Sequence, residues 1–456
     1  MDTPLFDALS AHVARQTNSY HTPGHKNGRL VPKALREAWG AGIWRYDATE
    51  ITGLDNLAHP EGVLAESMKG WAKARGCVEV QYLLGGTSLG LKAALYALCR
   101  GKKVFVPRHA HQSIYQGLAL AGATPVFLPV TFDDTLHIPL GIAVETLKSM
   151  AAQHPDCQHM VVVHPTYHGI TWQNAALFQG ASTLGITTIV DEAHGAHFYG
   201  EEMPASSIAL GADVVIASAH KTLPCLTQAS VMMISNPALV DALKESVRLL
   251  HTTSPSYLLM ASLEMAGAWL FAEGPTVMAE GRARIERLRA QFADNPVLTI
   301  AEDKAWHSDP FKCYLVSAHV SGETLGQHLE AHGQMVEMCD GTGALLLMPL
   351  DGGDAALADC LTTVANALAQ LPKETKPQPC YLPTPPPCVV PVAEAWMAPR
   401  HYLPLKKALH HVAGGILEAY PPGIPLVVPG ERITQEVLDV WQRAGHSLDA
   451  TVAVLS

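Results

Sequence analysis

A lysine and an aspartate follow two apolar segments of the chain, and both side chains are suited to chemistry. Lys221 lies shortly after the apolar run 213–217, and Asp191 directly follows the apolar run 186–190. Burial disfavours an ammonium ion, so a lysine at the end of a buried strand is poised to form an imine with an aldehyde. A carboxylate at the end of a second strand can hold a protonated ring nitrogen. The pair therefore predicts a pyridoxal 5'-phosphate site, with Lys221 on the aldehyde and Asp191 on the pyridine nitrogen.

A glycine-rich turn supplies candidate ligands for the phosphate. Gly85-Gly86-Thr87-Ser88-Leu89-Gly90 follows an expected strand and opens an expected helix, where amides and hydroxyls can bind an anion. Glycine is also common in such turns for conformational reasons, so the motif alone leaves both interpretations open. It is not a P-loop, because a leucine rather than a lysine follows the last glycine. Ser218 and His220, beside Lys221, add two more groups that can bind phosphate.

Four histidines near expected strand ends allow two interpretations. His111 can stack on a flat heteroaromatic ring, whereas His109 and His111 together with His194 and His197 are also candidate metal ligands. Residues two apart share a face on a strand, but the loop after the strand does not keep that order, so no metal geometry is defined. We expect no metal, with His109 and His197 as solvated or core residues and His111 and His194 in the site.

The segment Asp191-Glu192-Ala193-His194 has the letters of a helicase motif, in which the carboxylate serves nucleotide-bound magnesium. That function needs a phosphate-binding lysine loop and a basic surface for nucleic acid, and the sequence indicates neither. The simpler alternatives are a helix N-cap for Asp191 and a surface position for Lys221. The apolar or small residues that precede His220 argue against free exposure of the lysine.

Composition restricts the class of protein. The 456 residues are 48% hydrophobic and 16% charged, which indicates a well-buried enzyme rather than a disordered or fibrous chain. A formal charge of −11 makes nucleic acid and anionic membranes poor partners. The nine cysteines are scattered and never form a Cys-x-x-Cys pair, so neither a disulfide framework nor a zinc ribbon is indicated. Without a leader-like or membrane-spanning apolar stretch, we expect a cytoplasmic protein.

The central part of the chain predicts an α/β fold. Short apolar runs alternate with helical patterns, as in a mostly parallel sheet covered by helices on both faces. We expect seven strands at residues 78–84, 103–106, 125–128, 160–164, 186–190, 213–216 and 230–234. We expect helices at residues 88–100, 113–121, 143–152, 174–184 and 237–250. Ligands of such sheets bind beyond the carboxyl ends of the strands, where the candidate residues fall.

The rest of the chain predicts smaller parts. After two helical stretches at 258–273 and 280–292, we expect an α+β region with strands near 314–320 and 345–348 and a helix at 355–371. The proline-dense segment after it cannot continue a helix or a central strand, and it predicts an extended linker. The expected parts are an N-terminal segment 1–60, a large cofactor domain 61–294, a small α+β domain 295–371, a linker 372–391 and a C-terminal domain 392–456.

Several motifs resemble the bacterial ornithine/lysine/arginine decarboxylases. They include Ser218-Ala219-His220-Lys221 and the segments 21–28, 47–57, 227–230, 420–425 and 429–431, so the resemblance spans nearly the whole chain. It implies the aspartate-aminotransferase fold, which is pyridoxal-phosphate fold type I, and a homodimer or assembly of dimers whose subunits share each site. The N-terminal segment would then help form the dimer and close the substrate pocket. The sequence resembles short members without the N-terminal wing domain.

The resemblance also implies roles for individual residues. Lys221 would hold the cofactor, Asp191 would contact the pyridinium nitrogen, and His111 would stack on the ring. The remaining implied cofactor contacts are Thr87, Ser88, Ser218 and His220 near the phosphate, and His194 near the ring hydroxyl. Cys225 and the stretch 410–415 depart from the family pattern, and the second departure bears on which amino acid is accepted.

The expected reaction is decarboxylation of a basic L-amino acid to its amine and carbon dioxide. The resemblance to short family members favours arginine over lysine or ornithine. Asp191 would keep the ring nitrogen protonated, and His220 or Lys221 would return a proton to the α-carbon. The distal cation of the substrate needs a carboxylate partner. The candidates are Asp47, Glu50, Asp55, Glu61 and Glu431.

Two other classes of function stay open at the level of the sequence. An aminotransferase or acyltransferase of the same fold would retain Lys221 and Asp191, but it would ordinarily need an arginine for the substrate carboxylate. A non-catalytic relative that binds the cofactor or a diamine would show cofactor absorption without product. The altered residues at 414–415 are the one feature that points to the latter, and release of carbon dioxide with an amine distinguishes the three.

Overall fold

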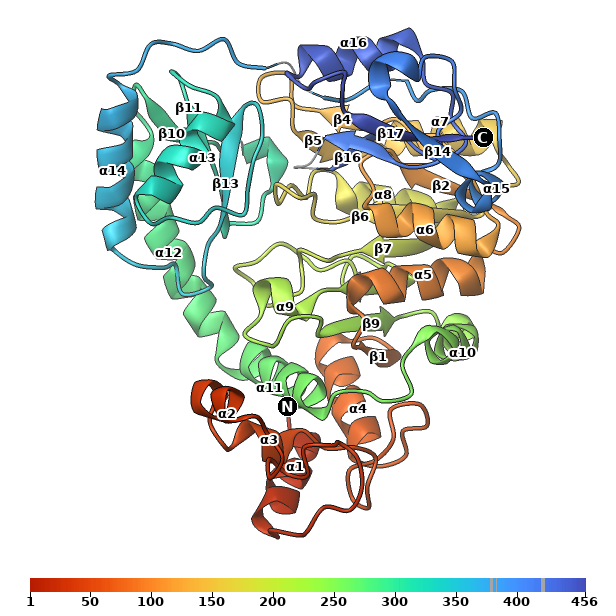
Figure 1. The fold of residues 1–456 in the computed structure, drawn as a ribbon, viewed down its shortest axis with the longest axis vertical. Coiled ribbons are helices and arrows are strands. Elements are labelled where there is room, and N and C mark those ends of the chain that lie inside the picture. The colour runs from red at the N-terminus through yellow and green to blue at the C-terminus, as the bar shows by residue number, and fades with distance from the viewer. Residues whose placement is uncertain (303, 378–379, 383, 420–422) are drawn as a thin grey trace. The chain divides into compact units, whose positions relative to one another are not determined.

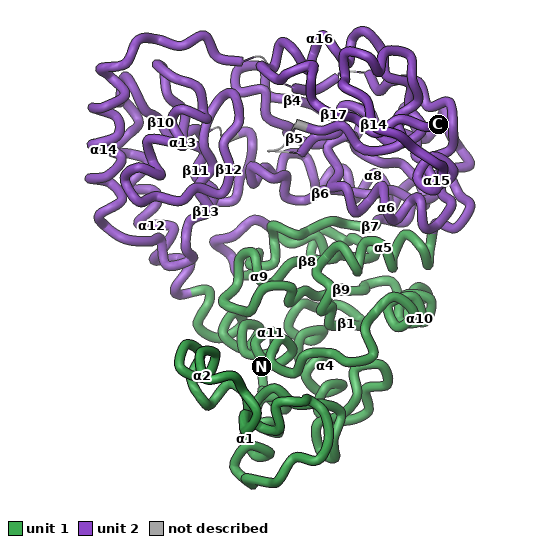
Figure 2. The backbone as a smooth tube through the Cα atoms, viewed as in Figure 1, with its two compact units in different colours: residues 1–98, 189–199, 205–275 green, residues 99–188, 200–204, 276–456 purple. Residues whose placement is uncertain are grey.

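A computed structural model describes the chain from residue 1 to 456 except residues 303, 378–379, 383 and 420–422 (Figure 1). Two compact units make up the chain (Figure 2). The first unit contains residues 1–98, 189–199 and 205–275, and the second contains residues 99–188, 200–204 and 276–456. Among the described residues, no helix is both long and apolar enough to cross a membrane.

The sequence-based prediction of a seven-stranded, mostly parallel sheet is confirmed. The strands follow the order β1-β9-β8-β7-β6-β2-β3, and β9 is antiparallel to both of its neighbours. Each strand lies within one residue of its expected position. Strands such as β8 and β9 are apolar runs buried on both faces, whereas β3 at the edge of the sheet is only partly buried. The strands are β1 Glu79–Leu83, β2 Lys103–Pro107, β3 Thr124–Leu128, β6 His159–Val163, β7 Thr187–Asp191, β8 Val214–Ala217 and β9 Ser230–Ile234.

The first unit surrounds β1, β8 and β9 with helices. A tryptophan, Trp71 on α4, is fully buried, and a Cβ on Gly267 of α11 would lie 2.4 Å from its ring, so glycine permits this close helix contact. The N-terminal helix α1 is anchored by Glu264, whose carboxylate accepts the amides of Leu5 and Phe6 at 3.1 and 2.7 Å. The helices are α1 Pro4–Ala14, α2 Lys33–Trp39, α3 Ile43–Tyr46, α4 Val63–Arg75, α5 Gly86–Leu98, α9 Ala219–Thr222, α10 Val240–Leu250 and α11 Tyr257–Ala272.

The second unit contains a four-stranded antiparallel sheet of order β10-β11-β13-β12. Its strands are β10 Leu298–Ile300, β11 Lys312–Ser317, β12 Met338–Cys339 and β13 Gly343–Leu347. The associated helices are α12 Gly274–Phe292, α13 Gly322–Ala331 and α14 Ala356–Leu368. The expected strands at 314–320 and 345–348 and the helix at 355–371 correspond to β11, β13 and α14.

The same unit holds helices α6 Gln112–Ala121, α7 Val144–Gln153 and α8 Asn174–Thr183, and the hairpin of β4 Thr131–Phe132 with β5 Pro139–Gly141. The C-terminal residues form two further strand pairs and two helices. These are β14 Arg400–Pro404 with β17 Thr451–Leu455, β15 Leu417–Ala419 with β16 Ile424–Val427, α15 Val392–Met397 and α16 Gln435–Arg443.

The proline-dense segment 372–391 packs against this unit. Leu382 is buried in a core cluster that includes Leu405, Val437 and Trp441. Tyr381 stacks on Phe132 of β4, with ring centroids 3.8 Å apart. The described residues of the segment form no helix or strand apart from a single bridge between Cys388 and Glu431.

Candidate active site

Lys221 lies on a one-turn helix that directly follows a buried strand. β8 ends at Ala217, and Ser218 occupies the N-cap position of the short helix α9 without a side-chain cap hydrogen bond. Lys221 is the third residue of this helix. The helix stops after Thr222 because Leu223, which precedes a proline, adopts an extended conformation. The Nζ atom of Lys221 lies 3.1 Å from Nε2 of His194. The structure therefore brings together the lysine and one of the two histidines expected in the site.

Asp191 is the last residue of the strand next to β8. It pairs in parallel register with Ile216, and the amide of Glu192 donates to the Ile216 carbonyl oxygen at 2.9 Å. The segments that carry Asp191 and Lys221 thus leave the sheet at the same edge. Asp191 is buried, and its Oδ1 accepts the Ala193 amide at 3.2 Å. A buried carboxylate at this edge can complement a protonated ring nitrogen.

The glycine-rich turn reaches the same edge of the sheet. β1 and β8 are each antiparallel to β9, so their carboxyl ends coincide. Gly86 has φ +69°, which lets the chain turn from β1 into α5. The Ser218 hydroxyl donates to Oγ1 of Thr87 at 3.1 Å, and Ser88 follows in the first turn of α5. Two hydroxyl groups at the start of a helix form a suitable cradle for a phosphate.

His220 has one ring nitrogen committed to the backbone. Its Nδ1 lies 3.1 Å from the carbonyl oxygen of Ala229, so in the neutral ring Nδ1 carries the proton and Nε2 carries the lone pair. Burial lowers the pKa of His220 below its ordinary value, the hydrogen bond to Ala229 opposes this, and the charge of Lys221 adds to it. The ring is therefore held in one orientation beside Lys221.

The other candidate histidines lie in different surroundings. His111 belongs to the second unit, where it caps α6 and its Nδ1 accepts the Ser113 amide at 3.2 Å. His109 has no hydrogen-bond partner at either ring nitrogen among the described residues, and burial lowers its pKa to about 4. His197 is fully buried. No group of three or more His, Cys, Asp or Glu side chains in the described chain is arranged to hold a metal ion.

Two acidic candidates for substrate binding, Asp47 and Glu50, each contact one side chain among the residues that the structure describes. Asp47 lies 3.1 Å from Nε2 of His25, and Glu50 accepts the Thr49 hydroxyl at 2.5 Å. Glu61 lines a hollow of about 480 Å³ in the first unit, together with Tyr82 and His251. These three carboxylates keep capacity for a further partner.

Asp55 has a different environment. Its two oxygens accept four backbone amides, those of Asn56, Glu61, Gly62 and Leu64, at 2.8 to 3.1 Å. Burial alone would raise the pKa of Asp55, but these four hydrogen bonds lower it below its usual value. Asp55 is therefore the centre of the turn that leads into α4.

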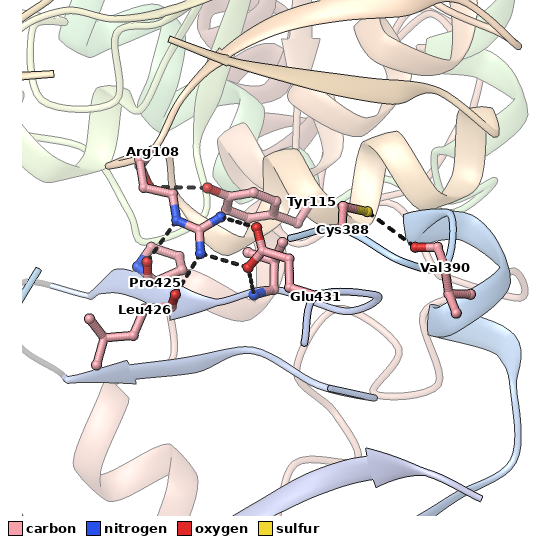
Figure 3. Close-up of polar contacts among 8 residues, drawn as sticks. Arg108, Tyr115, Cys388, Val390, Pro425, Leu426 and Glu431 are labelled. Carbon is pink, nitrogen blue, oxygen red and sulfur yellow. Dashed lines mark hydrogen bonds and ion pairs between the residues drawn. The ribbon is translucent and has the colours of Figure 1, made fainter. Parts of the chain in front are cut away.

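Glu431, the C-terminal candidate, is fully buried against Arg108 (Figure 3). Its Oε1 and Oε2 accept hydrogen bonds from Nη1 and Nη2 of Arg108 at 2.7 and 2.8 Å. The same guanidinium donates to the carbonyl oxygens of Pro425 and Leu426 at 3.0 and 2.7 Å. Both carboxylate oxygens are thus engaged. The pairing joins residues 323 positions apart, so no local sequence signal could have revealed it.

The residues fit pyridoxal phosphate by their chemistry. The hydroxyls of Thr87 and Ser218 suit the phosphate, the buried Asp191 suits the pyridinium nitrogen, and the Lys221 amine suits the aldehyde. An α/β fold with this set of groups at the carboxyl edge of its sheet defines the class of pyridoxal-phosphate enzymes of fold type I.

The comparisons with known proteins narrow the class to a family. The protein-family model named "Orn/Lys/Arg decarboxylase, major domain" matches residues 3–322. The family model named "Orn/Lys/Arg decarboxylase, C-terminal domain" matches residues 385–444. The chain belongs to the Orn/Lys/Arg decarboxylase family, whose members are pyridoxal-phosphate-dependent carboxy-lyases.

Individual relatives cover almost the whole chain. The uncharacterized protein YaaO of Bacillus subtilis (strain 168) is 33% identical over 97% of this chain and 94% of its own length. An arginine decarboxylase of the same organism is 30% identical over 95% of this chain and 92% of its own length. The solved structure of the Escherichia coli constitutive lysine decarboxylase has a TM-score of 0.83 at 21% identity, and the match covers 100% of this chain and 82% of that one. The last comparison supports the fold.

Proposed function

We propose that the protein decarboxylates a basic L-amino acid, with arginine preferred over lysine and ornithine, to the corresponding amine and carbon dioxide. The observation that carries the proposal is the contact of Lys221 with His194 at the sheet edge where β7 presents Asp191. Membership of the family supplies the reaction class. The preference for arginine rests on relatives described as arginine decarboxylases that are 30% identical over about the whole chain.

Each candidate residue at the carboxyl edge of the seven-stranded sheet has a proposed role. Lys221 holds the cofactor, Asp191 keeps its ring nitrogen protonated, and His194 lies beside the lysine amine. Bound pyridoxal phosphate supplies the electron sink for the electrons that the departing carboxylate leaves behind. The groups proposed to bind the phosphate are Thr87, Ser88, Ser218 and His220, and His111 is proposed to stack on the ring.

We assign the return of a proton to the α-carbon to His220. Its Nδ1 is held by Ala229, so Nε2 is the ring nitrogen that remains to exchange a proton. Lys221 is the alternative donor. If His220 acts in this way, His220→Gln lowers kcat while the trapped cofactor remains on Lys221.

We place the distal cation of the substrate on Asp47, Glu50 or Glu61. Asp55 and Glu431 are excluded from this proposal because backbone amides and Arg108 already occupy their oxygens. Replacing the substrate-binding carboxylate by its amide should raise KM for arginine without removing the cofactor. We further propose that the protein is a homodimer or an assembly of dimers and that it is cytoplasmic. All nine cysteines are free thiols in the structure, which supports a reducing environment.

The test is to incubate the purified holoprotein separately with arginine, lysine and ornithine and to measure the amine and carbon dioxide formed. We expect agmatine from arginine as the main product. Lys221→Ala should abolish turnover and Asp191→Asn should slow it about 10²-fold or more while cofactor stays bound. A keto acid product, or full turnover in Lys221→Ala, would overturn the proposal.

A further inference from the structure

A second hollow, of about 510 Å³, lies in the second unit beside α13. We name it the α13 cavity. Residues of the β4–β5 hairpin, of α13, of the turn before β13 and of the proline-dense segment line it. All of these belong to one compact unit, and none of the residues proposed for cofactor or substrate belongs to the lining.

One face of α13 turns carboxylates toward the cavity. Glu323, Gly326, Gln327 and Glu330 all line it, and their spacing of three, four and seven residues places them on a single helix face. Seven residues of α-helix rise about 10 Å, so the two glutamates are anionic anchors about 10 Å apart along the axis. Gly326 is buried against Cys339, whereas Glu323, Gln327 and Glu330 are exposed.

Another part of the cavity lining contains a third carboxylate, that of Asp340, and a buried imidazole, that of His168. Asp340 accepts the Tyr314 hydroxyl at 2.6 Å and the amides of Thr342 and Gly343 at 2.8 and 2.9 Å, so it is held as an acceptor. His168 is buried, and its Nε2 lies 3.4 Å from Oδ2 of Asp340. In the neutral ring Nε2 then carries the proton, and Nδ1 is a buried acceptor with no partner among the described residues.

The rest of the lining is apolar or neutral polar, apart from the imidazoles of His137 and His446. Leu136, Ile138, Met335, Val336 and Tyr381 contribute to it, and no lysine or arginine is among the described lining residues. Lys376, close in sequence to the lining, donates to the Thr342 carbonyl oxygen at 3.3 Å. The cavity thus offers separated anions, a buried acceptor and an apolar surface between them. These features match a flexible chain with several N–H donors better than a single metal ion, and no metal-binding group occurs among the described residues.

We propose that the α13 cavity binds a linear aliphatic di- or polyamine, with its ammonium groups on Glu323 and Glu330 and its methylene chain on the apolar wall. Nδ1 of His168 accepts one of the N–H groups. This site goes beyond the proposed catalytic function and does not depend on it, because binding is measured directly and without turnover.

The experiment is calorimetric titration of the holoprotein with spermidine, putrescine and the singly charged n-butylamine. We expect spermidine to bind more tightly than putrescine and n-butylamine to bind weakest. The double variant Glu323→Gln/Glu330→Gln should weaken spermidine binding about tenfold, since each exposed ion pair contributes modestly and the two add. Glu145→Gln, an exposed glutamate on α7, is the matched control and should stay within about twofold of the unsubstituted protein.

Undiminished spermidine affinity in the double variant would overturn the proposal, because the amine would then be bound elsewhere. Equal competition by magnesium chloride and n-butylamine at the same charge concentration would also overturn it, because the effect would be general screening. The amine-release assay is run on the same samples. Binding that depends on Glu323 and Glu330 in a protein without decarboxylase activity would refute the catalytic proposal and leave this one standing.

Discussion

Arg108 and Lys221 are two basic side chains with different kinds of partner. The guanidinium of Arg108 donates to both oxygens of Glu431 and to two backbone carbonyl oxygens. The amine of Lys221 lies beside the imidazole of His194. Arginine stays protonated in proteins, whereas lysine can lose its proton and become a nucleophile. Arg108 thus serves the fold with a permanent charge, whereas we propose that Lys221 serves chemistry by losing its proton.

Exchanging the reactive cation for the permanent one should have the largest effect. Lys221→Arg keeps the positive charge and much of the volume, but a guanidinium does not form the required imine. We expect turnover to fall by at least about 10⁴-fold, as for loss of a covalent catalyst. The measurement is amine release under single-turnover conditions. If Lys221→Arg retained even a tenth of the activity, charge rather than nucleophilicity would be the function of residue 221.

Breaking the structural pair should cost stability. Glu431→Gln leaves the Arg108 guanidinium buried without its counter-charge, so the free energy of unfolding should fall by about 3–5 kcal/mol. The double variant Arg108→Met/Glu431→Leu removes both charges and should recover much of the loss. Urea denaturation of the three proteins measures this. A loss below about 1 kcal/mol in Glu431→Gln would show that the pair is not the anchor that the contacts indicate.

A second buried carboxylate, that of Glu192, should make stability depend on pH. Burial raises the pKa of Glu192 to about 7, against hydrogen bonds from Ser207 and the charge of Arg75. The pKa of Glu192 is higher in the folded protein than in the unfolded chain, so protonated Glu192 stabilises the fold. Its contribution is complete below pH about 4.5 and is lost as the pH rises through about 7. The loss is up to about 3 kcal/mol.

The variant Glu192→Gln should remove this pH dependence. Relative to the unsubstituted protein, it should gain stability between pH 5 and pH 8, as measured by the urea midpoint at the two values. A stability difference between the two proteins that does not change with pH would mean that Glu192 stays ionised throughout.

The smallest effect is expected at an exposed ion pair. Lys406 lies 2.5 Å from Asp449, and both side chains are more than half exposed. Lys406→Ala should change the free energy of unfolding by less than about 1 kcal/mol, because exposed pairs are screened by water and salt. It is therefore the control for Glu431→Gln. A loss as large as that of the buried pair would remove burial as the reason for the difference.

Local patterns in the sequence were sufficient for the sheet and for the positions of its chemical groups. β7 and β8 are short, largely buried strands, and a parallel sheet brings the ends of such strands to one edge. Asp191 and Lys221 could therefore be assigned to the same edge in advance. The N-terminal helices were not predicted. α2 buries none of its residues and α3 has four, so neither shows an apolar period.

The partners of individual carboxylates could not be predicted from the sequence, for a different reason. Glu431 and Asp55 were both candidates for the substrate cation, yet one is bound by an arginine 323 positions away and the other by four backbone amides. Neither partner leaves a periodic or compositional signal. The same holds for the α13 cavity, whose lining joins a hairpin, a helix and the proline-dense segment.

The most direct test of the account is to find which residue carries the cofactor. The holoprotein is reduced with borohydride, digested, and its peptides are examined by mass spectrometry for a pyridoxyl group. We expect the label on Lys221, and no label in Lys221→Ala. A label on any other lysine, or a label that survives in Lys221→Ala, would contradict it.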